Sequence, residues 1–190
     1  MLVEGTLRSL AKLMEFLDRA SRYDGRPRER AVALQEADEL YYRLYPGHYL
    51  ALQLIRAASH LNRRITDRRT VPVQRCESRF VSLLLTILGE ALRTGDLVLS
   101  GARTAEEVAF SLWALALGTR TLMNARLASR TLDVEGGIVL AREATELLMD
   151  ALHWRPLSNE WDYEQTRRRI RQTLFAEEWQ QARSQWPQPA

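Results

Sequence analysis

Cysteine and lysine are nearly absent from this chain of 190 residues, which holds one of each, Cys76 and Lys12. A single cysteine excludes a disulfide bond within the chain, which fits a reducing compartment, and we expect a cytoplasmic protein. Arginine supplies almost all of the positive charge, which we interpret as codon bias. Because the net charge is only +3, composition alone does not indicate a nucleic-acid-binding protein.

Long hydrophobic runs and targeting signals are missing as well. No apolar stretch reaches the roughly 18 residues needed to cross a bilayer, so we expect no membrane partner. The N-terminal MLVEGTLRSL lacks the basic segment, apolar block and small-residue cleavage site of a signal peptide. With 46% hydrophobic and 27% charged residues, the chain has the composition of one soluble domain with its own core.

Catalytic and cofactor motifs are also missing: the chain has no GxSxG, HExxH, Walker or GxGxxG pattern. We therefore expect no enzyme activity and no cofactor. Glu143, Glu146, Asp150 and His153 recur at helical spacing on one face, and these residue types can bind a metal. No second helix offers a matching Glu-x-x-His, so a solvated face near a helix C-terminus is favoured and no metal is expected.

Helical spacing of apolar residues extends through almost the whole chain, whereas the alternation typical of strands is missing. The predicted helices cover residues 6–23, 27–45, 48–62, 73–94, 105–129 and 138–153, and an amphipathic segment follows at 161–179. Gly95 is placed as a helix cap, Thr104 and Glu107 form a capping box, and Gly136-Gly137 predicts a break. The sequence therefore predicts an all-α, multi-helix bundle.

A row of small side chains, Ala114, Gly118, Thr121 and Ala125, follows one face of the fifth predicted helix. Small residues let another helix approach closely, and a glycine inside a helix costs roughly 1 kcal/mol, so Gly118 indicates a packing reason. The sixth helix offers a matching surface of Ala141, Ala144, Leu148 and Ala151. Two such helices from each of two chains would form a homodimeric four-helix bundle. A monomer with both helices at its centre is the alternative.

Two segments, FVSLLLTILGEALRTGDL and TAEEVAFSLWALALGTRTLM, follow each other across a short loop. Together they resemble the C-terminal half of tetracycline-repressor (TetR/AcrR) family transcriptional regulators, and LLMDALHWRPL resembles the end of that family's last dimer helix. The resemblance covers roughly residues 7–157 and rests on helix order and length. It implies an effector-binding and dimerisation domain at 1–157, with 158–190 forming a C-terminal helix and tail docked on it.

Members of the family begin with a DNA-reading helix-turn-helix of roughly fifty residues, a pattern that the sequence does not show. The resemblance therefore implies contact with DNA only through a module absent from this chain. The implied function is a homodimeric sensor whose small hydrophobic effector controls an attached or missing DNA reader. The alternative is a stand-alone small-molecule- or lipid-binding helical protein with no DNA role. A helical-bundle enzyme, the third class, lacks a catalytic constellation.

The resemblance also implies a ligand pocket between the first, second, fourth and fifth helices. Its implied lining residues are Met14, Leu17, Tyr41, Tyr45, Phe80, Leu84, Leu88, Trp113 and Leu117. Aromatic and aliphatic walls with a few hydroxyls suit a hydrophobic small molecule. Each of these residues could equally belong to an ordinary core.

The segment at 161–179 carries the run Arg167-Arg168-Arg169-Ile170-Arg171. On a helix these arginines spread around the circumference, and nearby glutamates offset their charge, so we predict a solvated face and no DNA site. The aromatic residues Trp161, Phe175 and Trp179 suggest that the segment docks on the body of the protein, over the two dimer helices.

Overall fold

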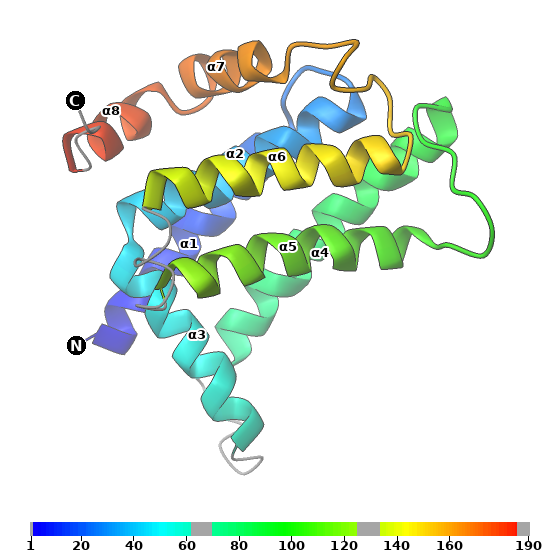
Figure 1. Ribbon diagram of the computed structural model, residues 1–190. Coiled ribbons are helices and arrows are strands. Elements are labelled where there is room, and N and C mark those ends of the chain that lie inside the picture. The colour runs from blue at the N-terminus through cyan, green and yellow to red at the C-terminus, as the bar shows by residue number, and fades with distance from the viewer. Residues whose placement is uncertain (1, 62–69, 125–133, 186–190) are drawn as a thin grey trace.

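A computed structural model describes residues 2–61, 70–124 and 134–185 of the chain (Figure 1). Within these ranges the chain forms eight α-helices and no strand, so the all-α prediction is confirmed. The helices are α1 (Leu2–Ser21), α2 (Pro27–Leu44), α3 (Pro46–Leu61), α4 (Thr70–Thr94), α5 (Ala105–Asn124), α6 (Val134–Ala151), α7 (Tyr163–Thr173) and α8 (Ala176–Gln185).

Local capping fixes the ends of the helices much as the sequence predicts. The backbone N–H of Thr104 donates to Glu107 Oε2 at 3.0 Å, and the N–H of Glu107 donates to Thr104 Oγ1 at 3.2 Å. These two bonds complete the capping box that starts α5. Gly95 follows α4 with a φ of 79°, a left-handed conformation that glycine adopts without steric cost.

The break predicted at Gly136-Gly137 is wrong, because α6 runs through both glycines. A Cβ atom added at Gly137 would overlap Sδ of Met123, near the end of α5. The missing side chain therefore lets α6 approach α5 closely. Helix packing outweighs the low helix propensity of glycine at this position.

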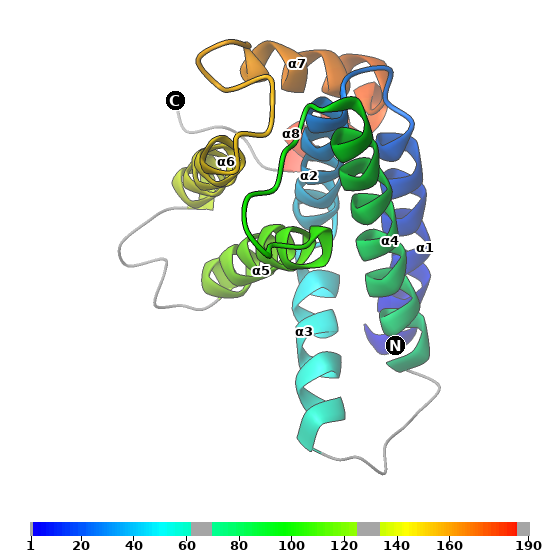
Figure 2. The ribbon, with the colours of Figure 1, turned by 90° about the vertical axis from the view of Figure 1, so that its right-hand side faces the viewer.

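The helices form a central group, a front pair and a C-terminal pair. In the centre, α1 and α2 pack on each other and both pack on α4, while α3 contacts α1, α2 and α4. The front pair is α5 and α6, which lie side by side and run in opposite directions (Figures 1 and 2). The largest fully buried apolar side chains of the centre include Phe16, Leu17, Leu40, Ile87 and Leu88.

The C-terminal helices α7 and α8 dock mainly on α2, and not mainly on the front pair as expected. Ile170 and Phe175 are fully buried, and the ring of Phe175 meets that of Phe16 edge-on at 5.6 Å between centroids. Trp161 stays partly exposed, with the guanidinium of Arg26 5.3 Å from its ring centroid. The aromatic residues after 161 therefore extend the core formed by α1 and α2.

The prediction of a solvated face is wrong for two arginines of α7. Arg167 is buried and its Nη1 donates to Glu36 Oε1 at 3.2 Å, while Arg171 Nε donates to Glu36 Oε2 at 2.6 Å. Arg168 and Arg169 are exposed as predicted. One helix face contains residues 167, 170, 171 and 174, and this face docks on the body of the protein. Two of the arginines, Arg167 and Arg171, therefore lie on the docked side of α7.

A second carboxylate of α2 joins that helix to α6. Arg142 Nη2 donates to both carboxylate oxygens of Glu39, at 2.6 and 2.7 Å, and Arg43 Nε donates to Oε1 at 2.9 Å. Burial raises the pKa of Glu39, but Arg142, Arg43 and Arg120 outweigh it and lower the pKa to about 2. Glu39 therefore remains ionised although it is buried.

A candidate ligand cavity and an exposed apolar face

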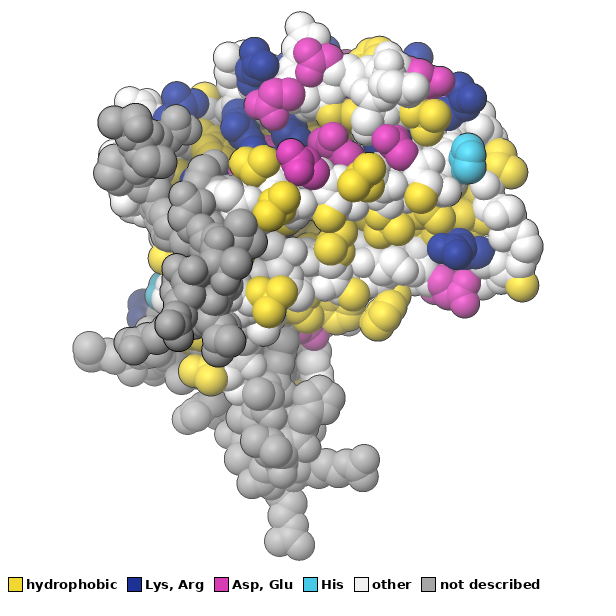
Figure 3. Space-filling model, in the orientation of Figure 1, with side chains coloured by type: hydrophobic (Ala, Val, Ile, Leu, Met, Phe, Trp, Pro, Cys, Tyr) yellow, Lys and Arg dark blue, Asp and Glu magenta, His cyan; other side chains and the backbone are white. Residues whose placement is uncertain are grey.

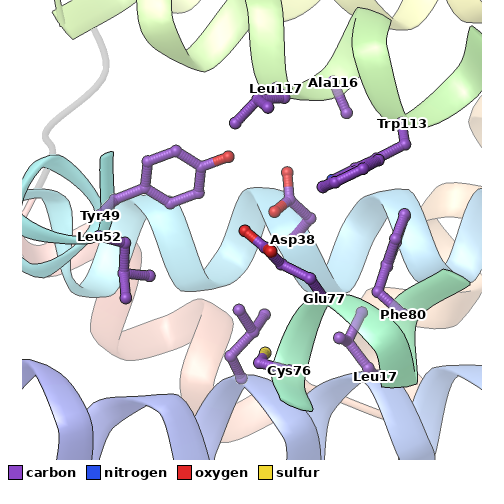
Figure 4. A pocket seen from close by; sticks show the side chains of 11 residues that line it. Leu17, Asp38, Tyr49, Leu52, Cys76, Glu77, Phe80, Trp113, Ala116 and Leu117 are labelled. Atoms are coloured by element: carbon purple, nitrogen blue, oxygen red, sulfur yellow. The ribbon is translucent and has the colours of Figure 1, made fainter. Parts of the chain in front are cut away.

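A cavity of about 40 Å³ lies where the first five helices meet (Figure 4). Helices α1 to α5 all contribute to its wall. The lining residues are Leu13, Leu17, Asp38, Tyr49, Leu52, Cys76, Glu77, Phe80, Trp113, Ala116 and Leu117. Most of these side chains are apolar, and Figure 4 shows the polar tips of Asp38, Tyr49 and Glu77 pointing into the space between them.

The structure brings four of the nine sequence-predicted ligand residues to this cavity: Leu17, Phe80, Trp113 and Leu117. The other five, Met14, Tyr41, Tyr45, Leu84 and Leu88, pack in or against the core and do not line it. Tyr41 shows why: it is fully buried, and its hydroxyl lies 2.8 Å from Ser9 Oγ. Burial raises the pKa of Tyr41 to about 12, so the phenol stays neutral.

Three polar lining residues, Asp38, Tyr49 and Glu77, were missed because the sequence interpretation followed apolar stripes. A helical-spacing signal was present for Glu77 and for Asp38. Glu77 precedes Phe80 by three residues, and Asp38 precedes Tyr41 by three, so each shares a helix face with a predicted residue. Polar residues at such positions are the ones that orient a ligand in an otherwise apolar pocket.

Asp38 connects the cavity to the ion pairs of α2. Its Oδ2 accepts a hydrogen bond from Arg120 Nε at 3.4 Å, and Arg120 is buried, with its guanidinium 5.0 Å from the ring centroid of Tyr42. Burial lowers the pKa of Arg120, but Asp38 and Glu39 outweigh it and raise the pKa above its ordinary value. Arg120 is therefore charged. It contacts Asp38 but does not itself line the cavity.

An open groove of about 860 Å³ adjoins the cavity on the outer side of α4 and α5. Its lining residues are Gln74, Glu77, Ser78, Val81, Ser82, Leu85, Thr86 and Trp113. Glu77 and Trp113 line both spaces, so these two half-buried side chains form a shared wall.

The cavity by itself holds only a few water molecules, since one water needs roughly 10–15 Å³ of such space. Pockets for drug-sized ligands measure roughly 300–1,000 Å³. A ligand of that size would have to occupy part of the groove as well, or displace lining side chains.

A second feature is an exposed apolar face on α5 and α6, which Figure 3 shows as hydrophobic side chains gathered over the front pair. Phe110, Leu122 and Leu147 are 66%, 64% and 69% exposed. We call the surface formed by Phe110, Leu122, Leu140 and Leu147, together with the small residues between them, the α5–α6 apolar face. Contiguous apolar surface of this kind usually marks an interaction site.

The predicted dimer residues border or belong to this face. Ala114, Thr121 and Ala151 are exposed, whereas Gly118, Ala141, Ala144 and Leu148 are half-buried, and Ala125 lies outside the described residues. A Cβ added at Gly118 would meet no atom within 4 Å in the described part of the chain. The packing reason expected for Gly118 therefore does not lie among the described residues.

The acidic face of α6 is used for ion pairs within the chain. Glu146 Oε1 accepts from Arg167 Nη2 at 2.8 Å, and Asp150 Oδ1 accepts from Arg28 Nη1 at 2.6 Å. His153 lies beyond the end of the helix with a φ of 54°. Among the residues that the structure describes, no three side chains of His, Cys, Asp or Glu come together as metal ligands would.

No family model, curated protein or solved structure was found to match this chain. The helices in the described ranges are all too short or too polar to cross a membrane. The two features of the described residues that point to a function are the cavity and the α5–α6 apolar face.

Proposed function

We propose that the chain is the effector-binding and dimerisation domain of a TetR-type transcriptional regulator. The observation that carries the proposal is the convergence of Leu17, Phe80 and Trp113, from α1, α4 and α5, on one cavity. The resemblance implies a pocket between these helices. Apolar walls with a few inward polar groups suit a small effector that has hydrophobic parts.

The position of α1 supplies a route for the signal. Leu13 and Leu17 of this first helix line the cavity, so an effector that occupies the cavity pushes directly on α1. A change in the pose of α1 would then reposition a DNA-reading module joined to it. Such control requires that the effector bind the two poses with different affinities.

A second copy of the chain is the proposed occupant of the α5–α6 apolar face. The face is exposed and hydrophobic, and it contains small residues that let helices approach closely. Two copies of the front pair would form an intermolecular four-helix bundle. A Cβ atom at Gly118 would meet no described atom within 4 Å, which is consistent with a partner helix at that point.

Light scattering tests the dimer. The wild-type chain should have about twice its mass of 21.9 kDa. Leu147→Glu places a charge on the face and should yield monomers, because an unpaired charge is costly to bury between helices. The matched control is Leu54→Glu, on α3 and 61% exposed, which should remain dimeric. A wild-type monomer at micromolar concentration would contradict this part of the proposal.

The reading frame upstream of Met1 separates the regulator from a stand-alone small-molecule- or lipid-binding protein. An in-frame helix-turn-helix would favour the regulator. Upstream sequence without one would favour the stand-alone binding protein, which would use the same cavity but have no DNA to control.

A further inference from the structure

The front pair of helices is attached to the rest of the chain by apolar side chains mainly at one end. This end contains the start of α5 and the end of α6, and it lies on the right in Figure 1. The side chains there that are buried in the hydrophobic core are Val108, Ala109, Leu112, Met149 and Trp154. We call this the anchored end, because moving it would expose apolar surface to water.

The opposite end of the front pair is joined to α2 by ion pairs. Among the described residues in the second half of α5, only Arg120 is buried, and its Nε donates to Asp38 at 3.4 Å. Arg142 of α6 donates through Nε and Nη2 to both carboxylate oxygens of Glu39, at distances between 2.6 and 2.9 Å. We call this the ionic end.

The two kinds of attachment respond differently to water. Exposed apolar side chains lose the benefit of burial, whereas separated ions recover their hydration, which offsets much of the lost attraction. The apolar side chains near the ionic end hold it less firmly: Met123 is half-buried, and Ile138 is buried but does not belong to the hydrophobic core. We therefore expect the ionic end to open at a lower cost than the anchored end.

The ionic end of α5 leads directly from a wall of the cavity. Ala116 and Leu117 line the cavity from α5, and in Figure 4 they lie across it from Leu17 of α1 and Cys76 of α4. A displacement of this part of α5 would therefore remove one wall and open the cavity to solvent.

We propose that the front pair is a hinged flap over the cavity, which pivots at its anchored end and is latched at its ionic end by Arg142–Glu39 and Arg120–Asp38. Hinged closure of this kind is a common conformational change around ligand sites. An open flap would enlarge a space that holds only a few water molecules when closed. The inference goes beyond the proposed function and does not depend on it, because it concerns the route into the cavity of a single chain, whatever the cavity binds.

Hydrogen–deuterium exchange locates the motion, because protected amides exchange when their segment opens. In the wild-type chain, the amides of 116–123 and 138–146 should exchange at least about tenfold faster than those of 109–112 and of the centre of α4. Arg142→Met leaves Glu39 less compensated in the closed flap, so it should accelerate exchange of the first two segments about tenfold further and leave α4 unchanged. Arg168→Met, at an exposed site of α7, is the matched control and should change neither.

The single cysteine of the chain reports access to the cavity directly. Cys76 is buried and lines the cavity, so the thiol reagent 5,5′-dithiobis(2-nitrobenzoate) should label it slowly in the wild-type chain. Labelling should be about tenfold faster in Arg142→Met, in proportion to the more frequent opening of the flap. Arg168→Met should be labelled at the wild-type rate.

Three results would overturn the flap. Wild-type exchange in 116–123 and 138–146 of the Arg142→Met variant would show that this arginine latches nothing. Acceleration of α4 by the same factor as the ionic end would show that the variant loosens the whole fold. Faster exchange at the ionic end with unchanged labelling of Cys76 would show that this end does not cover the cavity. None of these results bears on the dimer, which light scattering tests separately.

Discussion

Nη1 of Arg167 on α7 lies 3.2 Å from Oε1 of Glu36 on α2, and the two side chains are 1% and 0% exposed. The other terminal nitrogen of Arg167 donates to Glu146 on α6 at 2.8 Å. One buried guanidinium therefore joins α7 both to α2 and to α6. A charge in such a place is tolerated because its partners are present, and removing Arg167 takes one of two close cations away from the buried Glu36.

Replacing Arg167 should therefore destabilise the fold strongly. Arg167→Met should lower the free energy of unfolding by about 3 kcal/mol. This value lies at the lower end of the cost of breaking a buried ion pair, because Arg171 still contacts Glu36. Arg168→Met is the matched control, since Arg168 is the exposed neighbour, and its effect should stay within about 0.5 kcal/mol. Urea denaturation measures both. Equal effects would show that Arg167 is not held at this junction.

The buried carboxylate of Glu39 should make stability fall in acid. Its pKa is about 2 in the folded chain against an ordinary value of 4.5. Because the folded pKa is the lower one, the stabilisation is complete above pH 4.5 and is lost as pH falls from 4.5 toward 2. The difference corresponds to roughly 3 kcal/mol.

Urea denaturation between pH 7 and 2 measures this dependence. Glu39→Gln should be less stable than wild type at pH 7, and its stability should fall less steeply below pH 4.5. Glu143→Gln, at an exposed site, should keep the wild-type slope. A Glu39→Gln profile parallel to that of wild type would show that Glu39 is not the group that titrates.

His153 should be replaceable with a gain in stability. Its φ of 54° lies in the left-handed region, which costs a residue with a Cβ roughly 1–2 kcal/mol. The same turn contains a hydrogen bond from the Trp154 N–H to the Met149 carbonyl oxygen at 3.0 Å. His153→Gly should therefore raise the free energy of unfolding by about 0.5–1 kcal/mol, after allowance for the greater freedom of glycine in the unfolded chain.

Thermal denaturation followed by circular dichroism checks this increase. His153→Ala keeps a Cβ in the strained position and should give no gain. A gain of the same size with alanine would mean that the imidazole, and not the backbone conformation, causes the cost.

A substitution at Gly118 distinguishes packing of α5 within its own chain from packing against a second chain. A Cβ atom at this position meets no described atom of its own chain within 4 Å, so we expect Gly118→Leu to leave the isolated fold stable. In a dimer it should overpack the interface and weaken association by roughly 1–3 kcal/mol. Sedimentation at several protein concentrations measures the association constant. Wild-type association by the variant would show that the small-residue row faces solvent.

The helices were largely predictable because their ends depend on neighbouring residues. The capping box of Thr104 and the left-handed glycine at 95 act over three or four positions, so the sequence shows them directly. Gly137 misled the prediction because its role is set by Met123, a residue on another helix. Local pattern carries no information about which helix will lie alongside.

The cavity was predictable in its apolar part only. Leu17 and Trp113 stand in apolar stripes, whereas Glu77 looks like any surface glutamate until the neighbouring helices are placed around it. The burial of Arg167 was missed for a related reason, since a run of arginines indicates solvent unless the carboxylates that receive them are known. Polar residues acquire their roles from tertiary partners, which periodicity does not reveal.

The shared wall of Glu77 and Trp113 has a consequence for the speed of binding. If these two side chains close the way between the groove and the cavity, a ligand enters only when they rotate away, and it leaves only after the same event. Association would then be slower than diffusional encounter, and the lifetime of the complex would depend on the frequency of that rotation. A smaller residue in place of Trp113 would accelerate both steps, and the affinity would change less than either rate.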